Sequence, residues 1–388
     1  MICSNKVGFL FVIAVLALPT LFLNGYTFFH RLLLSAIELF AFIVICINAP
    51  KLKFRGTSIL FVVLLFYFIF NVFFNALTGK WQYGQISVPL IESLWWLLVF
   101  LLVYVLAQLN VLQINMLDSK LVVIVLTTIS LVVVFQIFFV DKLTFYTSNF
   151  AYIPLFFVPF VYLFKNVKLK VFLFFLIMIA VVLSMKRTAI VAFLCSFLAI
   201  GLSTFRNDKK NMLVVALYLG LLVLTFYHLN NYLENNLLYR FSNAVEDGGS
   251  GRTDIYSAVL NRFSELDFDA QLFGRGHNMV RGDEIYEIKN DNGRAFLSAH
   301  NDFIEVLYDY GYVGVILYFA LLVKIAQSCF FWRNRNDFYY RAMLSSFIIT
   351  ICVSLFSHLV IYPTYIANLS LLWAMMENEK NKLELAYG

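Results

Sequence analysis

Charged residues are scarce in this chain of 388 residues. Lys, Arg, Asp and Glu together make up 13% of it, about half of their usual share in soluble proteins. Apolar residues make up 62%, far more than a soluble enzyme or an intrinsically disordered chain contains. The 29 basic residues exceed the 23 acidic ones, but they are scattered through short segments rather than gathered in one patch. The composition therefore excludes a soluble enzyme, a disordered chain and a nucleic-acid-binding protein.

Cysteine is also rare, and several common site motifs are missing. The five cysteines lie in apolar runs or near the N-terminus: Cys3, Cys46, Cys195, Cys329 and Cys352. We expect each of them to be a small packing residue rather than part of a disulfide or a metal site. The sequence has no nucleotide-binding loop and no zinc-ligand spacing. Asp267 and Asp269 have the spacing of a metal-binding acidic pair, but that spacing is common in acidic loops, so we expect no metal and no cofactor.

Long apolar segments are abundant instead, and they contain most of the 43 Phe and 22 Tyr residues. These segments are continuously apolar, and in lipid only a helix then satisfies the backbone hydrogen bonds. They predict an all-α integral membrane protein with about twelve transmembrane helices, the first a retained helix rather than a signal peptide. The predicted crossings are residues 7–23, 31–49, 57–77, 86–109, 121–140, 150–164, 169–185, 188–205, 211–227, 303–327, 339–361 and 364–376.

Basic residues predict the orientation of these helices. They concentrate in alternate connections, such as residues 51–55, 165–170 and 206–210, which the positive-inside rule assigns to the cytoplasm. Both termini are then cytoplasmic, including a tail at residues 377–388. The polar segment 228–302, between the ninth and tenth helices, is then a large loop on the outer face.

The outer segment separates transmembrane helices one to nine (residues 1–227) from helices ten to twelve (residues 303–376). Its pattern predicts one amphipathic helix around residues 233–244 and a second that begins at Arg252, after the sequence GGSG. The second helix has an apolar stripe of Ile255, Val259 and Phe263. The remainder, up to Ala299, is expected to be loop. A long insertion with internal helices is typical of a lid or a binding surface.

Four cations near the outer ends of helices are candidates for binding a diphosphate. Lys186 and Arg187 lie in the tight turn between the seventh and eighth crossings, where a bound anion or lipid phosphates would hold them. Arg252 opens a helix after flexible glycines, a favourable place for an anion, although an ion pair with Asp254 is an alternative. Arg275 lies in a short GRG turn.

His300 is the candidate general base. It stands directly before the tenth crossing, and a neutral imidazole can accept a proton from a sugar hydroxyl. On an ideal helix it shares a stripe with Gly311 and Gly314. Its polar neighbours are candidates for contacting the acceptor: Asn301, Asp302 and Glu305. The alternative is an interfacial histidine that only bonds a backbone carbonyl.

Four segments, in this order, resemble the O-antigen polymerase and ligase superfamily of bacterial polysaccharide assembly: SMKRTAIVAF, GSGRTDIYSAVL, FGRGHN and SAHNDFIEVLYDYGYVGVILY. The histidine motif of that family is met by His300, Asn301 and Gly311. Arg187 and Arg252 match the family's arginines before a crossing and in the outer loop. The motifs cover about residues 184–320, and the N-terminal half is similar only in being polytopic.

The resemblance implies a metal-independent, inverting glycosyl transfer from an undecaprenyl-diphosphate-linked glycan, at the outer face of the bacterial inner membrane. Arginines would stabilise the leaving diphosphate, and His300 would take the acceptor proton. A polymerase adds the glycan to another lipid-linked repeat unit, and a ligase transfers it to the lipid A core. The motifs fit both; we favour a polymerase because polymerases are more numerous.

The same resemblance implies several partners. They are the undecaprenyl-diphosphate-linked oligosaccharide, membrane lipid, a chain-length regulator and a flippase. A lipid flippase or transporter is the alternative outside this class, but such proteins usually have paired repeat halves, and this sequence has none.

Overall fold

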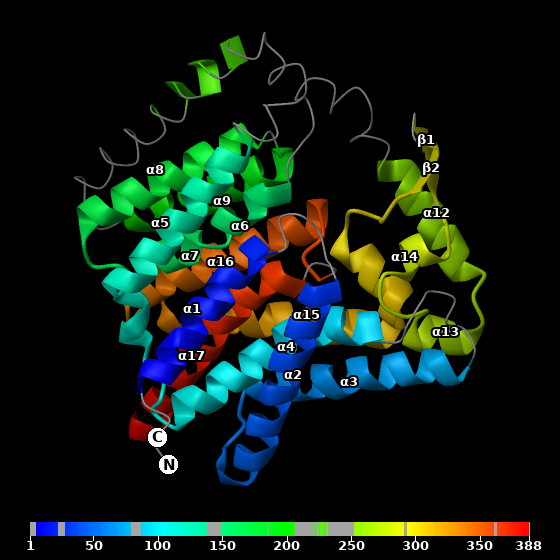
Figure 1. Cartoon of the computed structure of the whole chain (residues 1–388), viewed down its shortest axis with the longest axis horizontal. Coiled ribbons are helices and arrows are strands. Elements are labelled where there is room, and N and C mark those ends of the chain that lie inside the picture. The colour runs from blue at the N-terminus through cyan, green and yellow to red at the C-terminus, as the bar shows by residue number, and fades with distance from the viewer. Residues whose placement is uncertain are drawn as a thin grey trace. The chain divides into compact units, whose positions relative to one another are not determined.

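The computed structural model describes residues 5–21, 28–78, 87–137, 149–184, 186–205, 252–290, 293–360 and 363–387, with short pieces between residues 220 and 231. Almost all of these residues are helical, as the continuous apolar segments predict (Figure 1). The chain divides into two compact units. The first is made of Met1–Ile114, Gly251–Ser328 and Ser354–Gly388, and the second of Asn115–Ser250 and Cys329–Val353.

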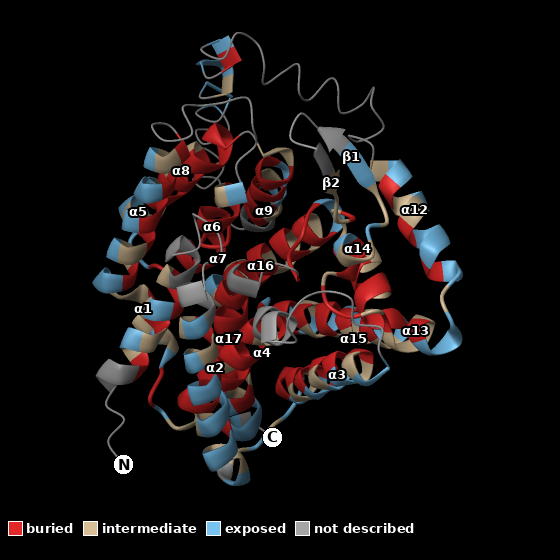
Figure 2. Cartoon of the chain, turned by 45° about the vertical axis from the view of Figure 1, so that its right-hand side comes forward, coloured by how far each residue is buried: buried red, intermediate tan, exposed pale blue. Residues whose placement is uncertain are grey.

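The first unit is built around one buried helix, α4 (Ser87–Gln108). Its other main helices are α1 (Asn5–Leu21), α2 (Phe28–Asn48), α3 (Thr57–Leu77), most of α15 (Asp302–Trp332) and α17 (Pro363–Tyr387), with the short turn η1 (Ala49–Lys51) after α2. Helix α17 packs along α4, and α2 and α3 also contact it. Every side chain from Trp95 to Ala107 is buried, so α4 is buried on every side. Figure 2 colours each residue of the chain by its burial. A helix that is apolar all round is a core helix.

A buried carboxylate on α17 holds the start of α3. Glu377 Oε1 accepts the backbone N–H of Thr57 at 3.0 Å, and Oε2 accepts its hydroxyl at 3.0 Å. Gly56, just before α3, has a φ of 56°, and a Cβ there would lie 2.4 Å from Oε1 of Glu377. Helix α17 continues to Tyr387, so the residues that the sequence predicts to be a tail from position 377 are helical, and Asn381 among them is buried.

Helix α15 is broken at Gly311, where φ is 67° and ψ is −170°. A break in a helix leaves carbonyl groups without their usual donors. Three replacement bonds supply these donors: Arg275 N–H to Tyr308 O at 3.0 Å, Gly276 N–H to Asp309 O at 2.8 Å, and the Tyr67 hydroxyl to Tyr310 O. A Cβ at Gly311 would lie 2.3 Å from Leu272 O, so the break also lets two backbones meet. The turn at Arg275 and Gly276 is thereby tied to α15.

The polar segment that the sequence predicts to be loop after α12 contains regular structure. After α12 (Arg252–Ser264) come α13 (Phe268–Phe273), α14 (Met279–Gly282) and a hairpin of β1 (Glu287–Asn290) and β2 (Gly293–Phe296). The strands are antiparallel, with Glu287 opposite Phe296. The prediction of loop up to Ala299 is therefore wrong for these residues, because short elements of four to six residues carry too little periodicity to be recognised.

The second unit contains shorter helices. They are α5 (Lys120–Phe135), α6 (Tyr152–Leu155), α7 (Val158–Val161), α8 (Val167–Leu183), α9 (Arg187–Phe205) and most of α16 (Asp337–Phe356), with the turns η2 (Ile114–Asp118) and η4 (Asn149–Ala151). Helix α8 packs against α5, α6 and α7. Ser119 and Asn166 cap α5 and α8, since each side-chain oxygen accepts the N–H three residues later, at 3.3 Å.

The predicted sixth crossing, residues 150–164, is not one continuous helix. It forms η4, α6 and α7, separated by a turn at Phe156 and Phe157. Pro154 and Pro159 lie in this stretch and cannot donate backbone hydrogen bonds, which accounts for the interruption. The residues are buried all the same, so the segment belongs to the interior of the second unit.

Within the part of the chain that the structure describes, three helices are long and apolar enough to cross a membrane, namely α3, α15 and α16, and several apolar helices are shorter. Large apolar side chains of α3 are exposed, including Phe66 at 64%. Such a surface suits lipid contact, and the chain is a multi-pass membrane protein. The count of about twelve helices and the orientation stay predictions. The predicted ninth crossing, 211–227, lies mostly outside the described residues, and the predicted helix at 233–244 lies wholly outside them.

Candidate functional site

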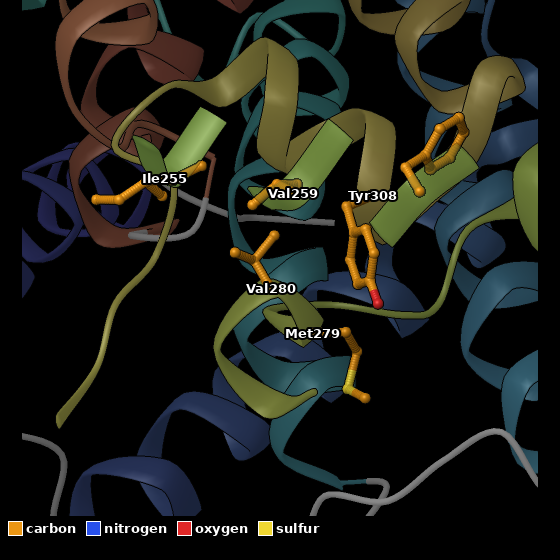
Figure 3. Close-up of a cluster of buried hydrophobic side chains, with 7 residues drawn as sticks. Ile255, Val259, Met279, Val280 and Tyr308 are labelled. Carbon is orange, nitrogen blue, oxygen red and sulfur yellow. The ribbon is translucent and has the colours of Figure 1, made fainter. Parts of the chain in front are cut away.

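Helix α12 is anchored by the apolar stripe that its sequence predicts. Ile255, Val259 and Phe263 are buried in a cluster with Met279, Val280, Ala299 and Tyr308 (Figure 3). In Figure 3 Val259 of α12, Val280 of α14 and Tyr308 of α15 lie near the middle of this cluster. The cluster holds the polar segment against the N-terminal part of α15, directly after His300.

Asp302, the first residue of α15, is fully buried and binds the chain that follows α16. Its carboxylate accepts the N–H of Leu359 at 2.9 and 3.0 Å and that of Val360 at 3.3 Å. The hydroxyl of Tyr318 also approaches it, at 3.5 Å. Backbone N–H groups thus occupy this carboxylate, so Asp302 is a structural residue and not the acceptor ligand that its position in the sequence suggests.

Glu305, one turn later, is also buried, with 1% of its surface exposed. Its Oε1 accepts the N–H of Ala299, directly before His300. The same oxygen lies 3.6 Å from Nδ1 of His358. Glu305 therefore supports the backbone next to His300 and pairs with a second histidine, and we do not retain it as an acceptor ligand.

Asp309 holds the start of α14 through backbone N–H groups. Its two carboxylate oxygens accept the N–H of Asn278 at 2.6 Å and of Met279 at 2.9 Å. An acidic side chain at a helix start is favourable because the N–H groups there have no partner inside the helix. The three acids that share a face of α15 thus each hold a different connection by its backbone.

His300 lies before α15 rather than within it. Its φ is 56°, a left-handed conformation that is uncommon for residues other than glycine. The helix begins at Asp302 and breaks at Gly311. The predicted stripe of His300 with Gly311 and Gly314 is therefore wrong, because helical spacing cannot be extended through two left-handed residues. The imidazole instead lies against His358, with the ring centroids 4.2 Å apart.

Asn301 is the N-cap of α15. Its Oδ1 accepts the N–H of Phe303 at 2.9 Å and of Ile304 at 3.3 Å, and its Nδ2 donates to Leu355 O at 3.2 Å. These bonds give both polar atoms of the Asn301 side chain a partner within the protein, so its position is explained without an acceptor sugar. Asn301 therefore fixes the start of the helix directly after His300.

Arg275 is committed to an internal ion pair. Its guanidinium donates to Asp283 at 3.0 and 3.3 Å, and the hydroxyl of Tyr308 donates to the same carboxylate at 2.7 Å. Burial by itself would lower the pKa of Arg275, but the hydrogen bond and charge of Asp283 raise it above the ordinary value. A guanidinium held in this way braces the turn before α14, and we do not retain it as a diphosphate ligand.

Arg252 has the opposite setting. It is the first residue of α12 and is partly exposed. Among the residues that the structure describes, it has no hydrogen-bond or ion-pair partner, so the alternative of a pair with Asp254 is not observed. A guanidinium at a helix N-terminus, with no internal partner in the described part of the chain, can accept an anion.

Lys186 and Arg187 belong to the second unit. Arg187 begins α9, and both side chains are partly buried. The ammonium of Lys186 lies 5.8 Å from the ring centroid of Tyr152. Arg187 and Arg252 belong to different units, and the binding of one diphosphate by both of them stays a prediction.

Asp267, one of the two acids with metal-like spacing, caps α13 by accepting the N–H of Ala270 at 3.2 Å, whereas Asp269 is exposed.

Two histidines also have roles that the sequence did not indicate. His358 lies beside His300, and His277 Nδ1 is 2.8 Å from the hydroxyl of Tyr310. No local pattern marks either contact, because the partners are 58 and 33 residues apart.

Residues 172–319 match the family model described as O-antigen ligase, which begins within α8 and ends within α15. The match includes Arg187, Arg252 and His300 and stops before His358. No curated protein matches the chain. The resemblance drawn from the four motifs to the O-antigen polymerase and ligase superfamily is confirmed by the family model over residues 172–319.

Proposed function

We propose that this protein is a membrane glycosyltransferase that polymerises an undecaprenyl-diphosphate-linked glycan. The observation that carries the proposal is His300, which lies inside the matched family region on a backbone held by Glu305 and Asn301. Uncommon backbone conformations persist where the surrounding structure holds them, and they cluster at functional sites. A base must be held in this way if it is to meet a hydroxyl in one geometry.

The reaction requires one proton acceptor and one anion-stabilising group. The oxygen of the acceptor hydroxyl attacks the anomeric carbon of the donor sugar as the bond from that carbon to the diphosphate breaks. His300 takes the hydroxyl proton, and the diphosphate leaves with the bonding electron pair. Arg252, with Arg187 as the second candidate, stabilises the negative charge on the leaving group. The new glycosidic bond has the opposite anomeric configuration.

The test of this chemistry uses purified protein in liposomes with undecaprenyl-diphosphate-linked repeat units isolated from source cells that lack the chain. We expect His300→Ala to lower the rate of chain extension about 10²–10⁴-fold, the usual contribution of a general base. Chelators should leave the wild-type rate unchanged. If His300→Ala extends chains at the wild-type rate, the assignment of the base is wrong.

The diphosphate assignment is tested on the same assay. Arg252→Ala should raise the KM for the lipid-linked donor and lower kcat, and Arg252→Lys should not restore the full rate, because the planar guanidinium fork is lost. Arg262 is the matched control, since it is on the same helix but is paired with Glu265 at 3.2 Å on the surface. Full activity of the double variant Arg187→Ala, Arg252→Ala would overturn the assignment.

A ligase is the second candidate, since the matched family model is described as O-antigen ligase. Surface glycan from cells that lack the chain separates the possibilities. A single repeat unit on the lipid A core indicates a polymerase. Long chains that accumulate on the lipid carrier indicate a ligase, and repeat units that stay on the cytoplasmic side indicate a flippase.

A further inference from the structure

A buried carboxylate and imidazole lie directly beneath His300. The side chains of His358 and Glu305 are 6% and 1% exposed, and His358 Nδ1 is 3.6 Å from Glu305 Oε1. His358 lies in the connection after α16, outside the matched family region. The two residues after it, Leu359 and Val360, are bound by the carboxylate of Asp302. The bonds from Asp302 to the two residues after His358 therefore fix the position of His358.

His358 also contacts the candidate base. The ring centroids of His300 and His358 are 4.2 Å apart, and the ring planes are inclined by 39°. Two imidazoles at this distance do not easily carry positive charge together, because a like charge within about 4–6 Å disfavours the second one. One ring must therefore stay neutral when the other is protonated.

The surroundings decide which ring takes the proton. Glu305 adjoins His358, and a carboxylate favours the protonated form of its neighbour. The other acids near Glu305 are Asp302 and Asp309, both on α15. The titratable groups beyond these are Tyr318, which faces Asp302, and His277, which faces Asp309. Glu305 is therefore the acid against His358, and Asp302 holds the connection that carries His358.

We propose that the Glu305–His358 pair is the positioning partner of His300: it takes the positive charge that the two imidazoles share and leaves His300 neutral and oriented. This inference rests on the proposed role of His300 as the base. A neutral His300 can accept the proton of the acceptor hydroxyl, whereas a protonated one cannot. His358 acts through His300 and does not touch the substrate.

The direct test needs no substrate. Protein labelled with ¹³C at the Cε1 position of histidine is titrated by NMR in lipid nanodiscs, and the signals of the five histidines are assigned with single His→Gln variants. In the wild type, His358 should titrate at a higher pH than His300. In His358→Gln, the titration midpoint of His300 should rise by about one pH unit, because Glu305 is left without its cationic partner. Glu305→Gln keeps an oxygen for the N–H of Ala299 but removes the charge, so the midpoint of His358 should fall.

His277→Gln is the matched control, because it removes another buried imidazole of the same unit that bonds Tyr310 instead of His300. It should leave the midpoint of His300 unchanged. In the rate assay, the acid limb of the kcat/KM profile should move to higher pH in His358→Gln. A wild-type His300 that titrates above His358, or a His300 midpoint unchanged in His358→Gln, overturns the pairing.

The two proposals fail separately. If the His300→Ala variant is active, the proposed function is wrong, whatever the NMR titration of the wild type shows. An inactive His300→Ala variant together with an unchanged His300 midpoint in His358→Gln removes only the pairing. Loss of rate with no shift of the acid limb in His358→Gln would mean that His358 is merely structural.

Discussion

The surroundings of α4 and the start of α15 are packed in opposite ways, although both belong to the first unit. Around α4 the buried side chains are almost all apolar, and Phe61 and Phe100 stack with ring centroids 3.5 Å apart. Around the start of α15 the buried groups include two histidines and three carboxylates, and each carboxylate accepts backbone N–H groups. Apolar packing depends mainly on volume, whereas a buried polar cluster depends on every partner. The two regions should therefore tolerate substitution very differently.

The largest effect is expected at the break in α15. In Gly311→Ala, the new Cβ would meet the backbone oxygen of Leu272 at 2.3 Å, and the residue would have to keep a φ of 67°. A backbone atom cannot move aside as a side chain can, so we expect a loss of more than about 4 kcal/mol and little folded protein. Size-exclusion chromatography in detergent measures the folded fraction. Gly220→Ala is the control, since a Cβ there meets nothing within 4 Å; equal yields for both variants would contradict the strain argument.

An intermediate effect is expected at the buried acids. Asp309→Ala leaves the N–H groups of Asn278 and Met279 without their acceptor, which should cost about 2–4 kcal/mol. Asp309→Asn keeps one acceptor oxygen and should cost less. Phe61→Leu, in the apolar region, should cost only about 1 kcal/mol despite the larger change of shape. Thermal unfolding followed by intrinsic fluorescence ranks these variants, with exposed Asp269→Ala as the control. The contrast between the regions disappears if Phe61→Leu lowers the Tm as much as Asp309→Ala.

The smallest effect is expected on the exposed face of α3. Phe66 is 64% exposed, so Phe66→Ala should change stability by less than about 0.5 kcal/mol. Phe66→Asp should reduce membrane insertion instead, because a charge at the centre of a transmembrane helix costs about 2.5–3.5 kcal/mol. Glycosylation mapping of inserted protein measures this difference. If Phe66→Asp inserts normally, this face of α3 does not contact lipid.

The regular parts of the fold were predictable because their signals are local. The apolar segment 57–77 coincides with α3, and the start of α12 at Arg252 and its buried stripe are as predicted. Each of these features depends on residues within a few turns of one another. The hairpin β1–β2 and the short helices were not predictable, since each has too few residues to show a period.

The site was predictable only in part. The sequence indicated His300 and Arg252 through their motifs, and both lie in the first unit. His300 directly follows Ala299, whose N–H is held by Glu305. It also indicated Arg275, but the distance from Arg275 to Asp283 could not be read from the chain, and this pair removes Arg275 from the candidates. The helical stripe of His300 failed because His300 has a left-handed backbone and lies before the first residue of α15.

The amino-acid sequence by itself determined that this protein is helical and apolar, and that its residues 172–319 resemble the O-antigen polymerase and ligase superfamily. Periodicity, composition and motif spacing are properties of neighbouring residues. Only the tertiary structure decided what the buried charges do. It paired Arg275 with Asp283, turned the acids of α15 toward backbone amides and brought His358 to His300 across 58 positions. A buried charge is stable only beside its partner, and the tertiary fold decides which residue that partner is.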